Sequence, residues 1–278
     1  MKLGMHLSIA GGLPKSLDRA KVLGCQALQI FLQNPRGWRW RPVPRLEINN
    51  FLEKRQLHGI GLVIAHLSYL PNLAAADNQL YCRSWERLRQ ELTLGKSLGL
   101  DYLVCHPGHA CADEVSFERV AAGLHRIVSE LPPPPLILLE NTSGQKNELG
   151  HKIFHLQHII TLSRVPVGLC LDTAHAFAAG YNLRLAAGRK LLLQEITVGS
   201  GLRALKLIHL NDALFPCDSH RDRHWHLGQG TIGLPGMKKL LRRVFPWVEG
   251  VILETPKKNE YDDAQNLAVA RRILDEIN

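Results

Sequence analysis

Eight short apolar runs alternate with eight segments of helical periodicity along this chain of 278 residues. Runs of this kind predict strands buried on both faces, and the alternation predicts parallel strands joined by helices. The predicted strands are residues 3–8, 27–32, 61–66, 102–106, 136–140, 167–172, 205–210 and 251–254. The predicted helices are residues 14–23, 48–58, 84–98, 116–130, 152–162, 187–198, 235–244 and 262–277. Eight such units predict an α/β fold, a (β/α)8 TIM barrel that forms a single domain over residues 1–278.

Six consecutive predicted strands end in an imidazole or a carboxylate. These residues are His66, His106, Glu140, Asp172, His209 and Glu254. In such barrels the carboxyl ends of the strands form the active-site face, so the six side chains are expected to share one mouth. Buried carboxylates without partners are costly, and a mixed set of imidazoles and carboxylates suits zinc or a similar divalent ion.

Two further segments extend this set of metal-ligand candidates. His175 follows Asp172 by three residues and is expected in the loop after the sixth strand. In the segment HRDRHWH at 220–226, Asp222 and His224 are two apart, so an extended chain turns both to the same side. His220 and His226 share that parity, so spacing alone does not choose among the four. Nine ligands are too many for one zinc ion and fit three ions if one carboxylate bridges. Three zinc ions would leave the cluster positive, which suits a phosphodiester substrate.

The net charge favours a polyanionic partner. Lys and Arg number 34 against 25 Asp and Glu, which gives a formal charge of +9. Nucleic acid is the first candidate, and a basic but otherwise ordinary enzyme is the alternative. The segment NPRGWRWRPVPR at 34–45 mixes Arg with Trp, as expected for contacts with phosphates and stacked bases. The alternative is that Trp38 and Trp40 pack on the rim of the barrel.

The cysteines and the apolar segments favour a cytoplasmic protein. None of the six cysteines forms a C-x-x-C pair, and Cys105 and Cys170 lie inside apolar runs as expected for buried thiols. This usage favours a reducing compartment. No apolar segment approaches the roughly 20 residues that span a bilayer, and the first residues do not resemble a signal peptide. With no obvious association segment, a monomer is expected.

Eight motifs distributed over nearly the whole chain are specific when taken together. They are GMHLSIAGG at 4–12, AHLSYLPNL at 65–73, CHPG at 105–108, LENTSGQ at 139–145, LDTAHAFAAGYNLR at 171–184, HLND at 209–212, DRHWHLGQGTIG at 222–233 and LETP at 253–256. The chain thereby resembles the endonuclease IV family of apurinic/apyrimidinic endonucleases. The resemblance implies a TIM barrel with three zinc ions that hydrolyses the phosphodiester 5′ to an abasic site in double-stranded DNA. The products would carry a 3′-hydroxyl and a 5′-deoxyribose phosphate, and blocked 3′ ends would be trimmed by phosphodiesterase or phosphatase activity.

The resemblance also assigns roles to individual residues. It implies one zinc ion on His66, His106 and Glu140, a second on Glu140, Asp172, His209 and Glu254, and a third on His175, Asp222 and His224. Mn²⁺ or Fe²⁺ is possible at one or more positions. Glu140 would orient or deprotonate the attacking water. Arg36, Tyr69 and Leu70 would insert into the duplex where the abasic nucleotide flips out. The segment HACADE at 109–114 and Gln229 depart from the family pattern, which bears on loop contacts and removes no ligand.

Two other functions remain open from the residues alone. One is a sugar isomerase or epimerase on a similar barrel with one or two divalent metals, which needs neither Asp222 with His224 nor a basic segment at 34–45. The other is a non-catalytic barrel that binds nucleic acid and keeps metals for stability. Two motifs are expected to be decoys: HKIFH at 151–155 as a surface helix, and Gly228, Gly230 and Gly233 as a loop beside the metals. His6 is either a core histidine or a hydrogen-bond partner of a ligand.

Overall fold

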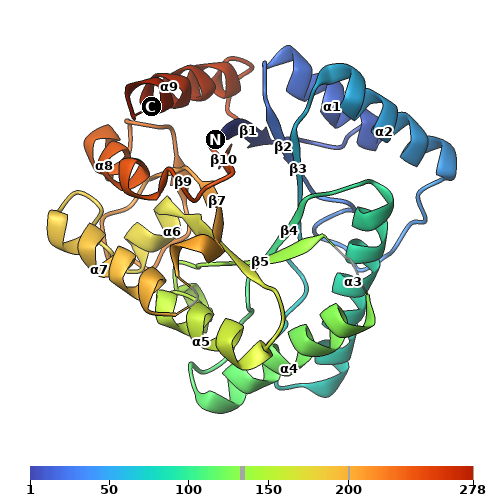
Figure 1. The fold of residues 1–278 in the computed structure, drawn as a ribbon, viewed down its shortest axis with the longest axis horizontal. Helices are drawn as coiled ribbons and strands as arrows, with labels where there is room; N and C mark the ends of the chain where they lie inside the picture. Colours follow the sequence, from blue (N-terminus) through green and yellow to red (C-terminus); the bar gives the residue numbers. More distant parts are fainter. Residues whose placement is uncertain (132–134, 200, 278) are drawn as a thin grey trace.

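The eight predicted strands close into one parallel barrel with the helices arranged around its outside (Figure 1). A computed structural model describes residues 1–131, 135–199 and 201–277. The strand order around the ring is β1, β10, β7, β6, β5, β4, β3, β2, and every neighbouring pair is parallel. This confirms the predicted TIM barrel. None of the helices within these ranges is long and apolar enough to cross a membrane.

The elements lie close to the predicted ranges. The barrel strands are β1 Lys2–His6, β2 Ala27–Ile30, β3 Leu62–His66, β4 Tyr102–Cys105, β5 Leu136–Glu140, β6 Gly168–Asp172, β7 Leu205–His209 and β10 Gly250–Leu253. The outer helices are α1 Leu13–Val22, α2 Arg45–His58, α3 Asn78–Ser97, α4 Glu114–Glu130, α5 Ile153–Ser163, α7 Ala186–Val198, α8 Leu234–Val244 and α9 Asp262–Ile277. The largest difference is at α3, which begins at Asn78 because the Asp77 carboxylate accepts a hydrogen bond from the Leu80 N–H and caps the helix.

Short elements beyond the eight units also form. Helix α6, Thr173–Ala178, follows β6 directly, and β8, Asp212–Ala213, pairs antiparallel with β9, His224–Trp225. The turns η1, Gln145–Asn147, and η2, Leu202–Ala204, are 3₁₀ helices. The sequence did not predict these elements, and α6 and the β8–β9 ribbon both lie next to the candidate site.

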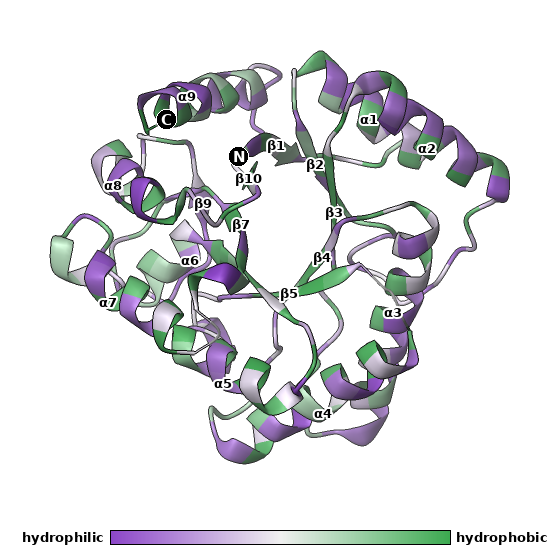
Figure 2. Cartoon of the chain, in the orientation of Figure 1, coloured by the Kyte–Doolittle hydropathy of each residue, from purple (hydrophilic) through white to green (hydrophobic). Residues whose placement is uncertain are grey.

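The apolar side chains form two layers that follow the alternation of each strand. One layer fills the barrel and consists of Ala27, Leu62, Ile64, Tyr102, Val104, Leu138, Cys170, Leu207 and Ile252. The other lies between the strands and the helices, and in Figure 2 the strands are largely green while purple segments are frequent on the outer helices. The interior has little free space: a Cβ on Gly250 would lie 2.4 Å from the Leu62 side chain.

The same alternation places polar side chains above the apolar filling of the barrel. Side chains two residues apart in a strand point to the same side, so the residue two positions beyond an inward-facing one also faces the barrel axis. In every strand this residue is polar, and it lies at or near the end of the strand or directly after it. The eight residues of this polar layer are His6, Gln29, His66, His106, Glu140, Asp172, His209 and Glu254. The candidate site is therefore built at the carboxyl ends of all eight strands, as expected for this fold.

Candidate metal centre

A pocket of about 440 Å³ opens at the carboxyl ends of the strands. Its wall contains most of the predicted ligands, which are His66, His106, Glu140, His175, Asp222, His224 and Glu254. Phe31, Tyr69, Arg223 and Lys257 complete much of the lining. The pocket is thus lined by imidazoles and carboxylates together with aromatic and basic side chains.

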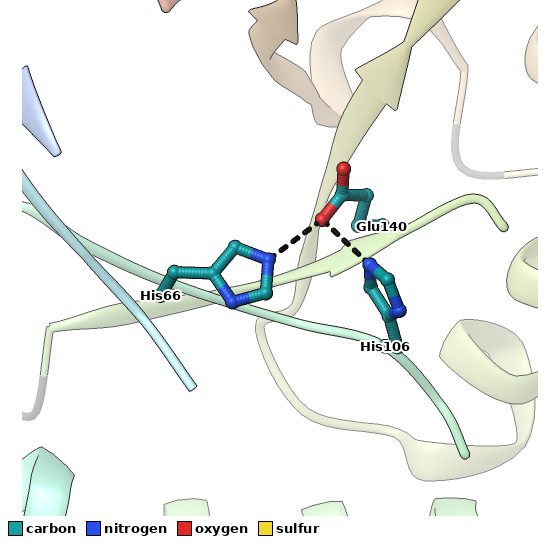
Figure 3. A group of neighbouring side chains, drawn as sticks. All are labelled: His66, His106 and Glu140. Atoms are coloured by element: carbon teal, nitrogen blue, oxygen red, sulfur yellow. Dashed lines mark hydrogen bonds and ion pairs between the residues drawn. The ribbon is translucent and has the colours of Figure 1, made fainter. Parts of the chain in front are cut away.

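His66, His106 and Glu140 form the first group of donors (Figure 3). The Nε2 atoms of His66 and His106 each lie 3.0 Å from Oε2 of Glu140. In Figure 3 both rings point toward this single carboxylate oxygen. The strands β3, β4 and β5 are neighbours in the ring, which brings the three residues together although they are far apart in the sequence.

Glu140 also belongs to a second group, with Asp172, His209 and Glu254. Nδ1 of His209 lies 2.7 Å from Oε1 of Glu140 and 3.2 Å from Oε2 of Glu254. The two oxygens of Glu140 therefore face two different groups, which is the arrangement of a bridging carboxylate. Cys170 lies within the same reach, but burial raises the pKa of its thiol to about 12, so it remains protonated and is a poor ligand.

His175, Asp222 and His224 form the third group. Nε2 of His175 lies 3.2 Å from Oδ1 of Asp222 and 3.3 Å from Nε2 of His224. Oδ2 of Asp172 lies 3.5 Å from Nε2 of His224, so this group adjoins the second one. His220 and His226 turn elsewhere, toward the Ser143 carbonyl and the Asn266 side chain. The structure brings together all nine predicted ligands and separates the two histidines that spacing did not exclude.

Two local structures position the third group. Asp172 is the N-cap of α6, and its Oδ1 accepts a hydrogen bond of 2.7 Å from the His175 N–H. The prediction that His175 lies in a loop is wrong, because this cap starts a helix immediately after the strand. His224 is held by the ribbon of β8 and β9, where it pairs with Ala213.

The glycine motif forms a loop beside the ribbon, as predicted. The buried carboxylate of Asp212 accepts hydrogen bonds from the N–H groups of Gly228, Gly230, Ile232 and Gly233, and also from its own neighbour Ala213. A carboxylate enclosed by backbone N–H groups is a stable anchor for a turn. The motif therefore fixes the segment after His224 and shows no sign of a dinucleotide fingerprint.

The ionisation of these groups favours bound cations. Burial alone would raise the pKa of Glu140, but His209 and His106 hold it well below its usual value. Burial alone would lower the pKa of His175, but Asp172, Asp222 and Glu140 raise it well above its usual value. The Glu140 carboxylate is thus ionised although it has no exposed surface. Such buried negative charge requires positive partners, and the donor set fits divalent metal ions.

The ring orientations of the histidines fit the same conclusion. Nδ1 of His66 lies 2.8 Å from the Leu67 carbonyl oxygen, and Nδ1 of His175 lies 2.9 Å from the carbonyl oxygen of Asn141. A carbonyl accepts the Nδ1 hydrogen, so in the neutral ring the lone pair of Nε2 faces the cluster, as in metal-ligating histidines. For His209 the acceptor is the side chain of Gln29, which the sequence analysis missed. The sequence does contain a signal for Gln29: it lies two residues after Ala27 in β2, so its side chain points to the same side as that of Ala27.

Of the three residues that the resemblance assigns to DNA contacts, Tyr69 lines the pocket. Tyr69 is 63% exposed, and its N–H donates to the Pro35 carbonyl, which joins the segments after β2 and β3. Arg36 is exposed and Leu70 is partly buried. Trp38 and Trp40 follow the alternative stated above: both are partly buried and pack against α3, where the guanidinium groups of Arg83 and Arg87 stack on their rings.

Two other histidine predictions are resolved by the structure. His6 lines the pocket, and its Nδ1 lies 3.2 Å from Oε1 of Glu254, so it is a partner of a candidate ligand and not only a core residue. The prediction of a surface helix for HKIFH is wrong for His155, which is 3% exposed. Its ring packs on Phe117, and burial lowers its pKa to about 4.

Comparisons with known proteins show sequence similarity along almost the whole chain. A family model described as a xylose isomerase-like TIM barrel matches residues 17–277. A probable endonuclease 4 from Halothermothrix orenii is 37% identical over 277 residues, which covers 98% of this chain and 100% of that protein. The crystal structure of endonuclease IV from Thermus thermophilus superposes with a TM-score of 0.88 at 35% identity, covering 99% of this chain and 100% of the other. A D-tagatose 3-epimerase-like protein shares the fold, with a TM-score of 0.73 at 19% identity and coverage of 100% and 98%.

Proposed function

This chain belongs to the endonuclease IV family, and we propose that it cleaves the phosphodiester 5′ to abasic sites in double-stranded DNA. The products would be a 3′-hydroxyl and a 5′-deoxyribose phosphate. Membership of the family makes the chain a phosphodiester-hydrolysing nuclease of DNA repair. The observation that carries the more specific proposal is the position of Glu140, whose two oxygens face two different groups of donors at one pocket.

We propose that residues 1–278 form one catalytic domain with three zinc ions. The family is metal-dependent, and the three groups would hold the ions as His66, His106 and Glu140; Glu140, Asp172, His209 and Glu254; and His175, Asp222 and His224. Mn²⁺ or Fe²⁺ could replace zinc at one or more positions. When bound, the ions supply Lewis-acid charge that polarises a phosphate and lowers the pKa of water.

The side chains of the pocket perform the remaining tasks. Glu140 is buried and lines the pocket, where its carboxylate can orient the attacking water and accept a proton from it. Arg223 and Lys257 line the wall and place positive charge beside the scissile phosphate. These groups are also suited to a phosphate at a blocked 3′ end, so we propose trimming of such ends as a second activity.

Arg36, Tyr69 and Leu70 would read the damage. Tyr69 reaches the pocket from its rim, and the hydrogen bond from its N–H to Pro35 keeps it beside the segment that carries Arg36. An apolar or aromatic side chain that enters the stack can fill the space left by a flipped nucleotide, and a guanidinium can hold the adjacent phosphate. The abasic nucleotide is the least costly to flip, since it has no base to unstack.

Incision of a defined duplex tests this function. We expect the metal-loaded protein to nick a duplex with one reduced abasic site and to leave a 3′ end that a DNA polymerase extends. A strong chelator should abolish the nick, and zinc should restore it. Undamaged duplex of the same sequence is the control. Retardation on a native gel without nicking would indicate a DNA-binding barrel. If the protein neither nicks nor retards the duplex, the epimerase alternative remains.

Elemental analysis of the active protein tests the metal content separately. We expect three zinc ions per chain in protein that nicks abasic DNA. Active protein with no transition metal would refute the metal centre, and a stable stoichiometry of one or two would refute the assignment of three groups. Manganese or iron in place of zinc would correct the identity of the ions and leave the residues unchanged.

A further inference from the structure

Gln29 is a neutral residue in a layer that otherwise consists of imidazoles and carboxylates. It lies in β2 two residues beyond Ala27 and is completely buried. Its Nε2 donates a hydrogen bond of 2.6 Å to Oε1 of Glu254, and its Oε1 lies 2.8 Å from Nε2 of His209. Nδ1 of His6 approaches the same amide nitrogen at 3.0 Å. One amide thus contacts two of the proposed ligands, from two other strands.

The chemistry of the amide determines which way it faces. The ionised carboxylate of Glu254 can only accept hydrogen bonds, so the NH₂ end of Gln29 must face it. The carbonyl end then faces His209 and accepts a hydrogen bond from its Nε2. A flipped amide would direct its oxygen at a carboxylate and would lose both bonds.

This orientation has a consequence for the ligand atom of His209. Because Nε2 donates its hydrogen to Gln29, the lone pair of the neutral ring is on Nδ1. Nδ1 is the atom that faces the carboxylates of Glu140 and Glu254, at 2.7 and 3.2 Å. Backbone carbonyls have the same role for the rings of His66, His175 and His224. At His209 the role falls to a side chain, which substitution can remove.

We propose that Gln29 is a positioning residue that fixes the tautomer of His209 and the orientation of Glu254, and thereby sets the affinity of the ion site that these two residues share. The inference deepens the proposed function and rests on the metal centre within it. It assigns a part in metal binding to β2, which supplies no ligand. A purely structural glutamine would support the packing of the barrel without any effect on one particular ion.

Three substitutions distinguish the two roles. Gln29→Met keeps the length of the side chain and removes both hydrogen bonds. Gln29→Glu keeps an acceptor for the Nε2 hydrogen of His209 but places a second negative charge against Glu254. Gln26→Met is the matched control, because Gln26 precedes the same strand, is exposed, and directs its side-chain oxygen to the Leu3 N–H at the opposite end.

The main measurement is zinc retained per chain during dialysis of the holoprotein against chelators of graded strength. We expect Gln29→Met to release one ion at a roughly 10- to 100-fold lower chelator strength than the wild type, the usual effect of removing a partner of a ligand. The other ions and the Gln26→Met protein should behave as in the wild type. Long-range ¹H–¹⁵N NMR of the histidine rings should show Nε2 protonated at His209 in the wild type and Gln29→Glu, and a mixture of tautomers in Gln29→Met.

Retention of all ions by Gln29→Met at the wild-type chelator strength, with an unchanged His209 tautomer, would overturn the proposal. If Gln29→Met does not fold, Gln29→Glu decides: an early loss of one ion with an intact tautomer supports the proposal, and wild-type retention overturns it. The measurement needs no DNA. A wild-type protein that holds zinc but does not nick abasic DNA would therefore end the proposed nuclease function and leave the role of Gln29 standing. A wild-type protein without bound metal would end both.

Discussion

The strands β1 and β2 differ from the other six in what they present at the mouth of the barrel. Strands β3 to β7 and β10 carry imidazoles and carboxylates at their last residue or directly after it, and these groups lie close to one another. Strands β1 and β2 carry His6 and Gln29 at this level, which contact Glu254 and belong to none of the candidate metal-binding groups found among the described residues. The ring is continuous, yet the potential donors lie in one sector, β3 to β7 and β10, while the adjoining β1 and β2 contact two of these donors, Glu254 and His209. We call the first of these the ligand sector. A metal centre built on eight equivalent strands therefore needs fewer than eight strands for its ligands.

The largest expected effect is at Glu140, which belongs to both the first and the second donor group. Glu140→Gln removes the negative charge between two donor groups, and we expect kcat on abasic DNA to fall by at least about 10³-fold. Single-turnover incision by protein of known metal content is the measurement. Glu249→Gln, an exposed residue before β10, is the control. Near-normal incision by fully metallated Glu140→Gln would show that Glu140 does not have the proposed catalytic role.

A second substitution tests whether the ligand sector also depends on orienting groups. Asp212→Asn replaces one oxygen of a carboxylate that five backbone N–H groups surround, so some of these groups lose their acceptor. We expect the free energy of unfolding to fall by about 2–3 kcal/mol and incision to fall by about 100-fold, since the turn after His224 loosens. Urea denaturation and incision assays measure the two effects. Asp218→Asn, on the exposed part of the same segment, should change neither; equal stability of both variants would show that the glycine turn needs no anchor.

A smaller effect is expected at β1. His6→Leu removes the ring that contacts Glu254 but leaves every proposed ligand in place, so we expect kcat to fall about tenfold with the zinc content unchanged. Metal analysis and steady-state incision distinguish this result from the loss of an ion. If His6→Leu lost as much activity as Glu140→Gln, the separation of the two sectors would be wrong.

The smallest effect concerns the segment after β2. Arg36→Ala should raise KM for abasic duplex about fivefold, because a phosphate contact at the rim is lost, while hydrolysis of a small phosphodiester stays unchanged. Arg272→Ala on α9 removes the same charge from an exposed site elsewhere and controls for the overall field. A parallel loss on both substrates would place Arg36 in the catalytic machinery and not in recognition.

The ligand sector was predictable from the sequence because the end of each apolar run marks the end of a strand. His66, Glu140, Asp172 and His209 all stand at such a point, and the fold brings them to one mouth. Gln29 was missed for a physical reason: it is neutral and lies inside an apolar run that continues to residue 32, past the observed end of β2 at Ile30.

Short elements and helix faces limited the rest of the prediction. The β8–β9 ribbon has two residues in each strand, too few for a visible alternation, so spacing does not select Asp222 and His224 over their neighbours. The resemblance selects them, and in the structure His220 and His226 turn elsewhere. Helix α6 was not predicted, because an Asp at the end of an apolar run indicates a ligand as readily as the cap of a helix, and Asp172 is in fact the N-cap of α6. His155 was misplaced because helical spacing defines a face without showing which way the face turns.

The pairing of β1 with β10 has a consequence for how the molecule matures. These strands are made first and last, and His6 and Glu254, which meet at their ends, are separated by 248 positions. During synthesis from the amino terminus, β1 keeps an open edge until β10 has left the ribosome. The donor group that includes Glu254 is therefore complete only when β10 closes the barrel, whereas His66, His106 and Glu140 lie on strands that are made earlier.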